Sequence, residues 1–273
     1  MTKHRYSHIM RKIALDMTVV ENSRLTSAYS LLILEADKPV EDFNFGDIKP
    51  GQFVQVRVDD SKTTFLRRPI SVNFVEPDRC RLHLLVRRAG EGTKVLCEMK
   101  EGEELNLLLP LGNGFSLPAS AEGFTPLLVG GGVGVAPLLY LGKQLADMGV
   151  RPSFLLAAKS DADLLLLERF REYGPVYIST DDGSLGVPGL VTANPALQQQ
   201  WSMIYCCGPM PMMKAVARIA RGNNVPCEVS LENTMACGLG ACLCCVEDTA
   251  DKGNVCVCTD GPVFPIERLR WFD

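Results

Sequence analysis

A cysteine-rich stretch near the C-terminus carries the residues best suited to chemistry. It reads Cys237-Gly-Leu-Gly-Ala-Cys242-Leu-Cys-Cys245, and Cys256-Val-Cys258 follows it. Cysteines separated by four residues and then by two, with a distant fourth, have the spacing that wraps a loop around a [2Fe–2S] cluster. Thiolates suit this role because soft, anionic sulfur holds ferric iron. The spacing predicts Cys237, Cys242 and Cys245 as ligands and leaves Cys256 and Cys258 as candidates for the fourth.

Closely spaced cysteines can also form a zinc site, a set of disulfides or a buried apolar patch, and these roles fit the pattern less well. Zinc sites usually contain two similar Cys-x2–4-Cys pairs, whereas this arrangement is asymmetric. Disulfides need an oxidising compartment, and the polar N-terminus Met-Thr-Lys-His-Arg-Tyr-Ser-His has no apolar signal core. Gly238 and Gly240 suit a cluster loop, which takes tight turns and brings backbone N–H groups near sulfur.

Length and charge limit the remaining possibilities. The chain has 273 residues, enough for two domains and a small appendage. With 28 basic and 32 acidic residues its net charge is −4, which gives no electrostatic basis for binding nucleic acid or an anionic membrane. The most apolar segment, residues 126–142, is broken by glycines and a proline and is not a spanning helix. Eleven cysteines without a signal peptide predict a cytoplasmic protein that uses cysteine for metal chemistry.

The first third of the chain predicts a small antiparallel β barrel without a long helix. Short β-like runs separated by Gly, Pro and Asp occupy residues 14–20, 29–34, 52–58, 81–86 and 104–109. Between them, Arg68-Pro-Ile-Ser71 offers a planar guanidinium to a phosphate, and Gly92-Thr93 offers backbone and hydroxyl donors. An arginine and a proline at the edge of a strand are also common surface features, so these residues alone do not decide whether a phosphate binds here.

From about residue 120 the pattern changes to alternating strands and helices. A buried strand over residues 125–130 leads into Gly130-Gly-Gly-Val-Gly-Val-Ala-Pro137 and then a helix, which is an arrangement that binds pyrophosphate. Strands are expected over residues 152–158, 175–180 and 200–206, and helices over residues 163–173 and 210–221. The predicted doubly wound parallel sheet places Asp181, Asp182, Cys207 and Gly208 at carboxyl ends of strands, where ligands bind. Tight packing and simple turns are the alternative roles for these residues.

The last segment predicts a β hairpin that the metal must hold together, because it is too short to bury a core of its own. The hairpin runs from Cys245 to Cys258 around a polar turn. Cys256 and Cys258 lie two residues apart on the expected strand and therefore face the same way.

These motifs together resemble the electron-transfer subunits of class 1B dihydroorotate dehydrogenase, within the ferredoxin-reductase superfamily. The resemblance covers nearly the whole chain from Arg11 onward, and the motifs occur in the family's order. They are Arg68-Pro-Ile-Ser71, Gly92-Thr93, Gly130-Gly-Gly-Val-Gly-Val-Ala-Pro137, Cys207-Gly-Pro-Met210, Cys237-Gly-Leu-Gly-Ala-Cys242 and Cys258-Thr-Asp-Gly-Pro-Val-Phe264.

The resemblance implies an FAD-binding barrel (residues 1–119), an NAD-binding α/β domain (residues 120–225) and a [2Fe–2S] segment (residues 226–273). The residues implied to bind FAD are Arg68, Pro69, Ile70, Ser71, Leu85, Val86, Arg87, Gly92 and Thr93. Those implied to face NAD are Gly131, Gly132, Gly134, Cys207, Gly208, Pro209 and Met210, and Asp181 is added as a candidate from its position at the end of a strand. Ser71 is the candidate catalytic residue near flavin N5. In the family, one residue separates the last cluster ligand from the Asp-Gly-Pro-Val-Phe run, which selects Cys258 as the ligand and leaves Cys256 without this role.

The implied function is electron transfer from dihydroorotate dehydrogenase, in pyrimidine biosynthesis, to NAD+. A partner catalytic subunit containing FMN would supply electrons, in a heterotetramer of two copies of each chain. FAD would link the one-electron cluster to hydride transfer. Ile70 departs from the aromatic residue of many ferredoxin reductases, although it fits the dihydroorotate branch. The rival predictions are a sulfide dehydrogenase or ferredoxin:NADP oxidoreductase subunit, against which Cys237 counts, and a zinc-stabilised nucleotide-binding regulator.

Overall fold

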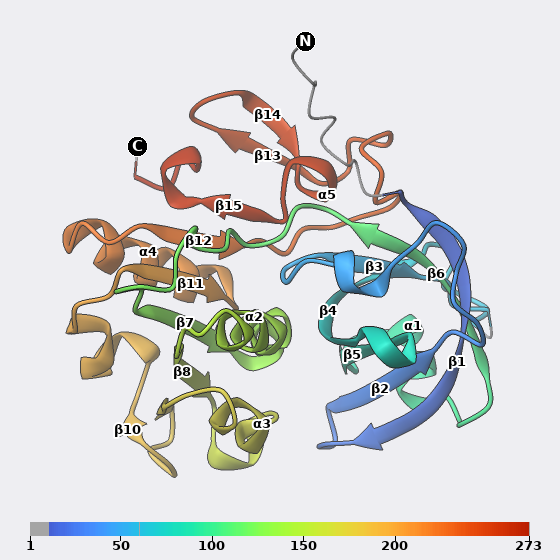
Figure 1. The fold of residues 1–273 in the computed structure, drawn as a ribbon, viewed down its shortest axis with the longest axis horizontal. Coiled ribbons are helices and arrows are strands. Elements are labelled where there is room, and N and C mark those ends of the chain that lie inside the picture. Colours follow the sequence, from blue (N-terminus) through green and yellow to red (C-terminus); the bar gives the residue numbers. More distant parts are fainter. Residues whose placement is uncertain (1–10, 60, 273) are drawn as a thin grey trace.

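The structure is a computed structural model that describes residues 11–59 and 61–272. An antiparallel barrel and a largely parallel sheet lie side by side, and the C-terminal segment runs along one edge of both (Figure 1). The prediction that the first residues lack a signal core concerns residues 1–10, which lie outside the described part. No helix among the described residues has the length and apolar character needed to cross a bilayer.

The barrel closes in the strand order β1-β2-β5-β4-β3-β6, which confirms the predicted antiparallel barrel. Its strands are β1 Ile13–Arg24, β2 Tyr29–Glu35, β3 Phe53–Val56, β4 Arg68–Glu76, β5 Arg81–Arg87 and β6 Glu104–Leu111. Alternating side chains fill the interior, because successive residues of a strand point to opposite faces. Val54 and Val56 of β3 lie in this core, whereas Phe53 belongs to a second core outside the barrel.

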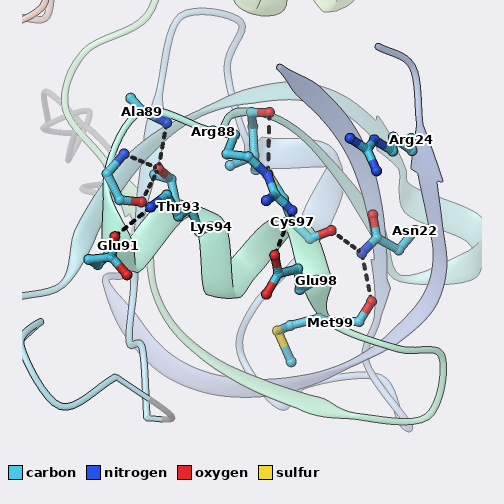
Figure 2. A network of polar contacts seen from close by, with 12 residues as sticks. Asn22, Arg24, Arg88, Ala89, Glu91, Thr93, Lys94, Cys97, Glu98 and Met99 are labelled. Atoms are coloured by element: carbon cyan, nitrogen blue, oxygen red, sulfur yellow. Dashed lines mark hydrogen bonds and ion pairs between the residues drawn. The ribbon is translucent and has the colours of Figure 1, made fainter. Parts of the chain in front are cut away.

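A helix that the sequence did not predict, α1 (Glu91–Glu98), lies between β5 and β6. It has only about two turns, and its buried positions are Gly92 and Leu96, so no long helical period marks it. Its N-terminus is fixed by Thr93, whose Oγ1 accepts hydrogen bonds from the backbone N–H groups of Ala89 (2.9 Å) and Gly90 (3.0 Å), as Figure 2 shows. The helix therefore forms through local capping.

The second unit is a sheet with the strand order β10-β9-β8-β7-β11-β12-β15. The strands are β7 Pro126–Gly131, β8 Ser153–Ala158, β9 Val176–Thr180, β10 Val187–Pro188, β11 Met203–Cys207, β12 Cys227–Ser230 and β15 Val263–Pro265. All pairs are parallel except β12 with β15. The chain adds strands on one side of β7 and then returns to add β11 on the other. This reversal creates the switch point at which doubly wound sheets bind ligands.

Helices cover both faces of the sheet, as a doubly wound fold requires. Helix α2 (Ala136–Asp147) packs with the core that continues into the barrel, and α4 (Met210–Gly222) packs with the second core on the opposite face (Figure 1). The predicted helix over residues 163–173 is wrong in length, because only α3 (Leu167–Arg171) forms. Leu166 has a φ of 56°, a left-handed conformation that interrupts a right-handed helix.

The C-terminal segment contributes to the sheet and also carries the predicted hairpin. β13 (Val246–Thr249) and β14 (Gly253–Cys256) pair as expected. The expectation of one strand through Cys258 is wrong, because β14 ends at Cys256 and the short helix α5 (Val257–Asp260) follows. Strands β12 and β15 lie within predicted segment 226–273 yet pair into the sheet. The domain boundaries at residues 119/120 and 225/226 stay predictions.

Candidate functional site

A cavity of about 300 Å³ lies where the barrel meets the sheet. From the barrel it is lined by Pro69, Ile70 and Ser71 of β4 and by Leu85 and Arg87 of β5. From the sheet it is lined by Val133 and Gly134 after β7 and by Cys207 at the end of β11. Some of the residues predicted to bind a flavin and some of those predicted to bind a dinucleotide thus line one cavity.

The barrel wall of this cavity follows from the pairing of β4 with β3 and β5. Ser71 is opposite Phe53 in the β3–β4 ladder, and both residues line the cavity. On β5 the alternation turns Leu85 and Arg87 toward the cavity residues, while the side chain of Val86 is fully buried in the barrel core. Val86 can therefore offer only its backbone to a ligand at this wall.

Helix α1 brings the other predicted phosphate residues to the same end of the barrel. A Cβ on Gly92 would stand 3.3 Å from Nε of Arg68, so Arg68 lies beside the first turn of α1. The guanidinium of Arg68 donates to the carbonyl of Leu66, at 3.2 Å from Nε and 3.1 Å from Nη2. Thr93 lines the cavity, although its hydroxyl already caps α1 (Figure 2).

The glycine turn after β7 packs against the turn after β11 at the switch point of the sheet. A Cβ on Gly134 would lie 2.4 Å from the carbonyl oxygen of Cys207 and 2.6 Å from Cα of Gly208. A Cβ on Gly131 would lie 2.6 Å from Sδ of Met212. Gly134 is therefore needed for close backbone approach, whereas a side chain at Gly131 would meet the Met212 side chain; both fit the packing role that the sequence left open.

Gly132 differs from the glycines around it, because its φ of 56° favours glycine while the space beside it is open. The atom nearest to a Cβ there would be the Tyr29 hydroxyl oxygen, at 3.7 Å. A 3-10 turn over Gly132–Val135 leads directly into helix α2 at Ala136, so the N-terminal end of this helical run lies at Gly132. Of the predicted turn Cys207–Met210, only Cys207 lines the cavity, and Met210 begins α4.

Asp181 and Asp182 lie outside the cavity, in the turn after β9 and two strands away from β7. The carboxylate Oδ1 of Asp182 accepts hydrogen bonds from the backbone N–H (2.9 Å) and hydroxyl (2.6 Å) of Ser184. These bonds lower the pKa of Asp182. Asp182 is thus a turn residue, one of the roles considered for this pair.

The sequence did not predict the cavity residues at and after the end of β12, among them Ser230, Glu232, Asn233 and Met235. The sequence signal that could have found them is their position at the end of a strand, but β12 was not predicted to pair into the sheet. Removal from water raises the pKa of the Glu232 carboxyl, and the charge of Arg87 opposes this shift. Burial, followed by the charge of Glu232, raises the pKa of the Cys207 thiol to about 12, so the thiol stays protonated at neutral pH.

The cysteine loop follows directly and packs on the outside of the barrel. Cys245 and Cys258 are buried, Cys237 is half-buried and Cys242 is exposed. Backbone N–H groups donate to three of the sulfurs: Leu239 to Cys237 (3.3 Å), Gly240 to Cys258 (3.1 Å) and Cys258 to Cys245 (3.4 Å). Bonds from Leu239 and Cys242 lower the pKa of Cys237 to about 6.

These N–H groups fit a loop that holds thiolates, because an anionic sulfur is an acceptor. Gly238 and Gly240 have φ values of 69° and 82°, as the predicted tight turns require. Within residues 11–59 and 61–272, no three His, Cys, Asp or Glu side chains are grouped closely enough to be recognised as a metal site. The assignment of ligands therefore rests on spacing, glycine turns and N–H donors.

Comparisons with known proteins identify the family to which the chain belongs. The model of the iron–sulfur cluster binding domain of dihydroorotate dehydrogenase B matches residues 232–270. The chain is 40% identical over 266 residues to the dihydroorotate dehydrogenase B (NAD(+)) electron transfer subunit of Shouchella clausii, which covers 95% of this chain and 99% of that protein. The Lysinibacillus sphaericus subunit is 43% identical over 80% of this chain and 86% of its own length. The chain belongs to this family of electron transfer subunits.

Solved structures extend the likeness to the whole fold. An NADH-dependent reduced ferredoxin-NADP oxidoreductase, studied for flavin-based electron bifurcation, has a TM-score of 0.81 and 27% identity, covering 93% of this chain and 90% of its own. The ferredoxin reductase of carbazole 1,9a-dioxygenase has a TM-score of 0.67 at 21% identity, covering 80% and 68%, and shares the fold. The predicted family, fold class and cofactor set of FAD, [2Fe–2S] and NAD are confirmed, whereas the individual site residues stay predictions.

Proposed function

We propose that this member of the electron transfer subunit family carries electrons from a partner dihydroorotate dehydrogenase to NAD+. The observation that carries the proposal is the single cavity shared by β4, β5 and the switch point of the sheet, with the cysteine loop packed nearby. A bound cluster carries single electrons, bound FAD exchanges one or two, and NAD+ accepts a hydride. The chain's residues have to hold these groups and exclude water.

For FAD, the proposed residues fall into a phosphate group and a ring group. Arg68 and the first turn of α1 lie together and supply positive charge and N–H donors for phosphate. Pro69, Ile70, Ser71, Leu85 and Arg87 form the cavity wall against which the flavin ring would rest. Ile70 offers an aliphatic contact in place of an aromatic stack, and Ser71 is the proposed catalytic residue, with a hydroxyl for flavin N5.

For NAD, the proposed residues are those around the glycine turn. Gly132 is the position where open space and a left-handed backbone coincide, beside the N-terminus of α2. Backbone N–H groups and the helix dipole favour an anionic pyrophosphate there. Gly131, Gly134 and Gly208 hold the turns in contact, and Cys207 brings a neutral thiol to the cavity. Pro209, Met210 and Asp181 keep only the support of the sequence pattern.

For the cluster, the proposed ligands are Cys237, Cys242, Cys245 and Cys258. The choice of Cys258 over Cys256 gains support from their contacts with Gly240. Sγ of Cys258 accepts the N–H of Gly240 at 3.1 Å, whereas the thiol of Cys256 donates to the carbonyl of Gly240 at 3.9 Å. A ligand sulfur is deprotonated and can accept but not donate, so the hydrogen bond that Cys258 accepts suits a ligand better than the one that Cys256 donates.

The partner is proposed to be an FMN-containing catalytic subunit that meets the chain at the cysteine loop, in a cytoplasmic heterotetramer of two copies of each chain. Leu239 and Leu243 expose 45% and 66% of their surface within the loop, and Val246 exposes 37%. Exposed apolar side chains gathered in one loop are typical of an interaction surface. The neighbouring Cys242 would bring the cluster close to this surface.

The test compares Cys258→Ser with Cys256→Ser in the full chain. We expect the first to lose the visible absorption and the EPR signal of a [2Fe–2S] cluster, and the second to keep both. The chain without its partner should reduce artificial acceptors with NADH but should not oxidise dihydroorotate. Retention of the cluster by Cys258→Ser would refute the ligand assignment, and dihydroorotate oxidation by the isolated chain would refute the role as a subunit.

A further inference from the structure

Gln55 of β3 is a buried amide with no assigned role. Its side chain has 0% exposure, and neither Nε2 nor Oε1 has a hydrogen-bond partner within the described residues 11–59 and 61–272. Buried amides are nearly always paired, because an unpaired polar group loses its bonds to water and gains nothing in return. An amide left without partners in the folded chain therefore points to a ligand.

The side-chain amide of Gln55 points out of the barrel. Val54 and Val56 face the barrel core, so Gln55, like Phe53, points outward. A Cβ on Gly238 would stand 2.8 Å from Cγ of Gln55 and 3.0 Å from its Nε2. The amide thus packs against the residue that follows the proposed ligand Cys237.

The N–H groups of Leu239, Gly240 and Cys258 that donate to sulfur all belong to the backbone of the cysteine segment itself. Gln55 approaches from the barrel, outside the loop, and carries two further N–H groups on Nε2. Cluster sulfurs are anionic acceptors that would satisfy this donor. The flavin is a weaker candidate, because Gln55 does not line the cavity although Phe53 and Pro69, its neighbours in the β3–β4 ladder, do.

We propose that Nε2 of Gln55 donates a hydrogen bond to the sulfur atoms of the bound cluster and thereby raises its reduction potential. The inference rests on the proposed cluster at Cys237–Cys258. Hydrogen bonds to cluster sulfur favour the reduced state, because reduction adds negative charge to the acceptor. The barrel would thus help to set the potential of a cluster that the C-terminal segment binds.

The test is an EPR-monitored redox titration of the full chain with its cluster, in the native protein, Gln55→Met and Leu111→Met. Leu111 is the matched control, because it is fully buried and its Cδ1 would lie 3.2 Å from the same Cβ on Gly238, but it has no donor. We expect Gln55→Met to lower the ratio of reduced to oxidised cluster about tenfold at a fixed solution potential, or about 59 mV for one electron. Leu111→Met should leave the ratio unchanged.

A second measurement detects the hydrogen bond directly. Pulsed EPR of the reduced native chain, grown with glutamine labelled with ¹⁵N in the side-chain amide, should show a ¹⁵N coupling that Gln55→Met abolishes. Absence of that coupling, or equal shifts in potential for the two Met variants, would overturn the role of Gln55 while leaving the cluster in place. Absence of any cluster signal from the native chain would instead refute the proposed cluster, and this inference with it.

Discussion

The contact between the two turns at the switch point makes Gly134→Ala the most informative substitution. The added methyl would lie 2.4 Å from the carbonyl oxygen of Cys207, 2.6 Å from its carbonyl carbon and 2.6 Å from Cα of Gly208. All three are backbone atoms of the turn after β11, so no flexible side chain can move aside. Gly134 does not have a positive φ, so the effect of the substitution on stability comes from the close approach and not from backbone strain.

Overpacking of this kind costs about 1–3 kcal/mol, and we expect the upper part of that range because backbone must shift. For a chain of this size, that corresponds to a fall in thermal midpoint of about 2–4 °C for each kcal/mol. Separation of the turns should also weaken NADH binding, which is measured by titration of the full chain.

The matched control is Gly222→Ala, at the end of α4. Nothing lies within 4 Å of a Cβ there, so this alanine should be neutral or stabilise by up to about 1 kcal/mol. If Gly134→Ala unfolds at the same temperature as Gly222→Ala and binds NADH as tightly as the native chain, the turns do not depend on this glycine and the reasoning is refuted.

Three further predictions concern buried or capping polar groups. Asn73→Ala should cost about 1–3 kcal/mol in urea unfolding, because Nδ2 of Asn73 donates to the carbonyl of Ala136 (2.9 Å) and joins the barrel to α2; an unchanged midpoint would contradict this. Thr93→Val should cost about 1 kcal/mol by removing the cap of α1, whereas Thr93→Ser should restore most of it in the same thermal melts. Burial lowers the pKa of His83 despite its hydrogen bond to Glu76, so the stabilising effect of the neutral imidazole is present above the unfolded pKa of about 6.5 and is lost as pH falls below it. The His83→Gln variant should therefore show a flatter dependence of unfolding free energy on pH between about pH 7 and 5. A dependence as steep as that of the native chain would be inconsistent with this role of His83.

The sequence predicted the parts of the fold that leave local marks. Alternating apolar residues revealed the barrel strands, and the glycine turn between a buried strand and a helix revealed the sheet. Helix α1 escaped because two turns carry little periodicity. The length of α3 was wrong because the left-handed conformation of Leu166 arises at a leucine, where the sequence gives no turn signal.

The site residues were likewise predicted where a local motif marks them and missed where only contacts between distant parts of the chain bring them together. Gly134 and Ser71 were selected from motifs whose residue types constrain the backbone. Glu232 was missed because it reaches the cavity only through the pairing of β12 with β11, a contact between distant parts of the chain. Gln55 was missed because a single glutamine in a strand has no pattern, and its burial against Gly238 is visible only in three dimensions.

Strand β3 connects the two proposed redox sites. Phe53 lines the cavity proposed for FAD, and Gln55, two residues later on the same face, contacts the cysteine loop. Two residues of a strand span only about 7 Å, so the spacing of the two sites depends on barrel backbone. Strand β3 is hydrogen-bonded to both β4 and β6, so Phe53 and Gln55 are held in a fixed position relative to each other. The cavity proposed for FAD and the loop proposed for the cluster therefore both rest on the same strand of the barrel.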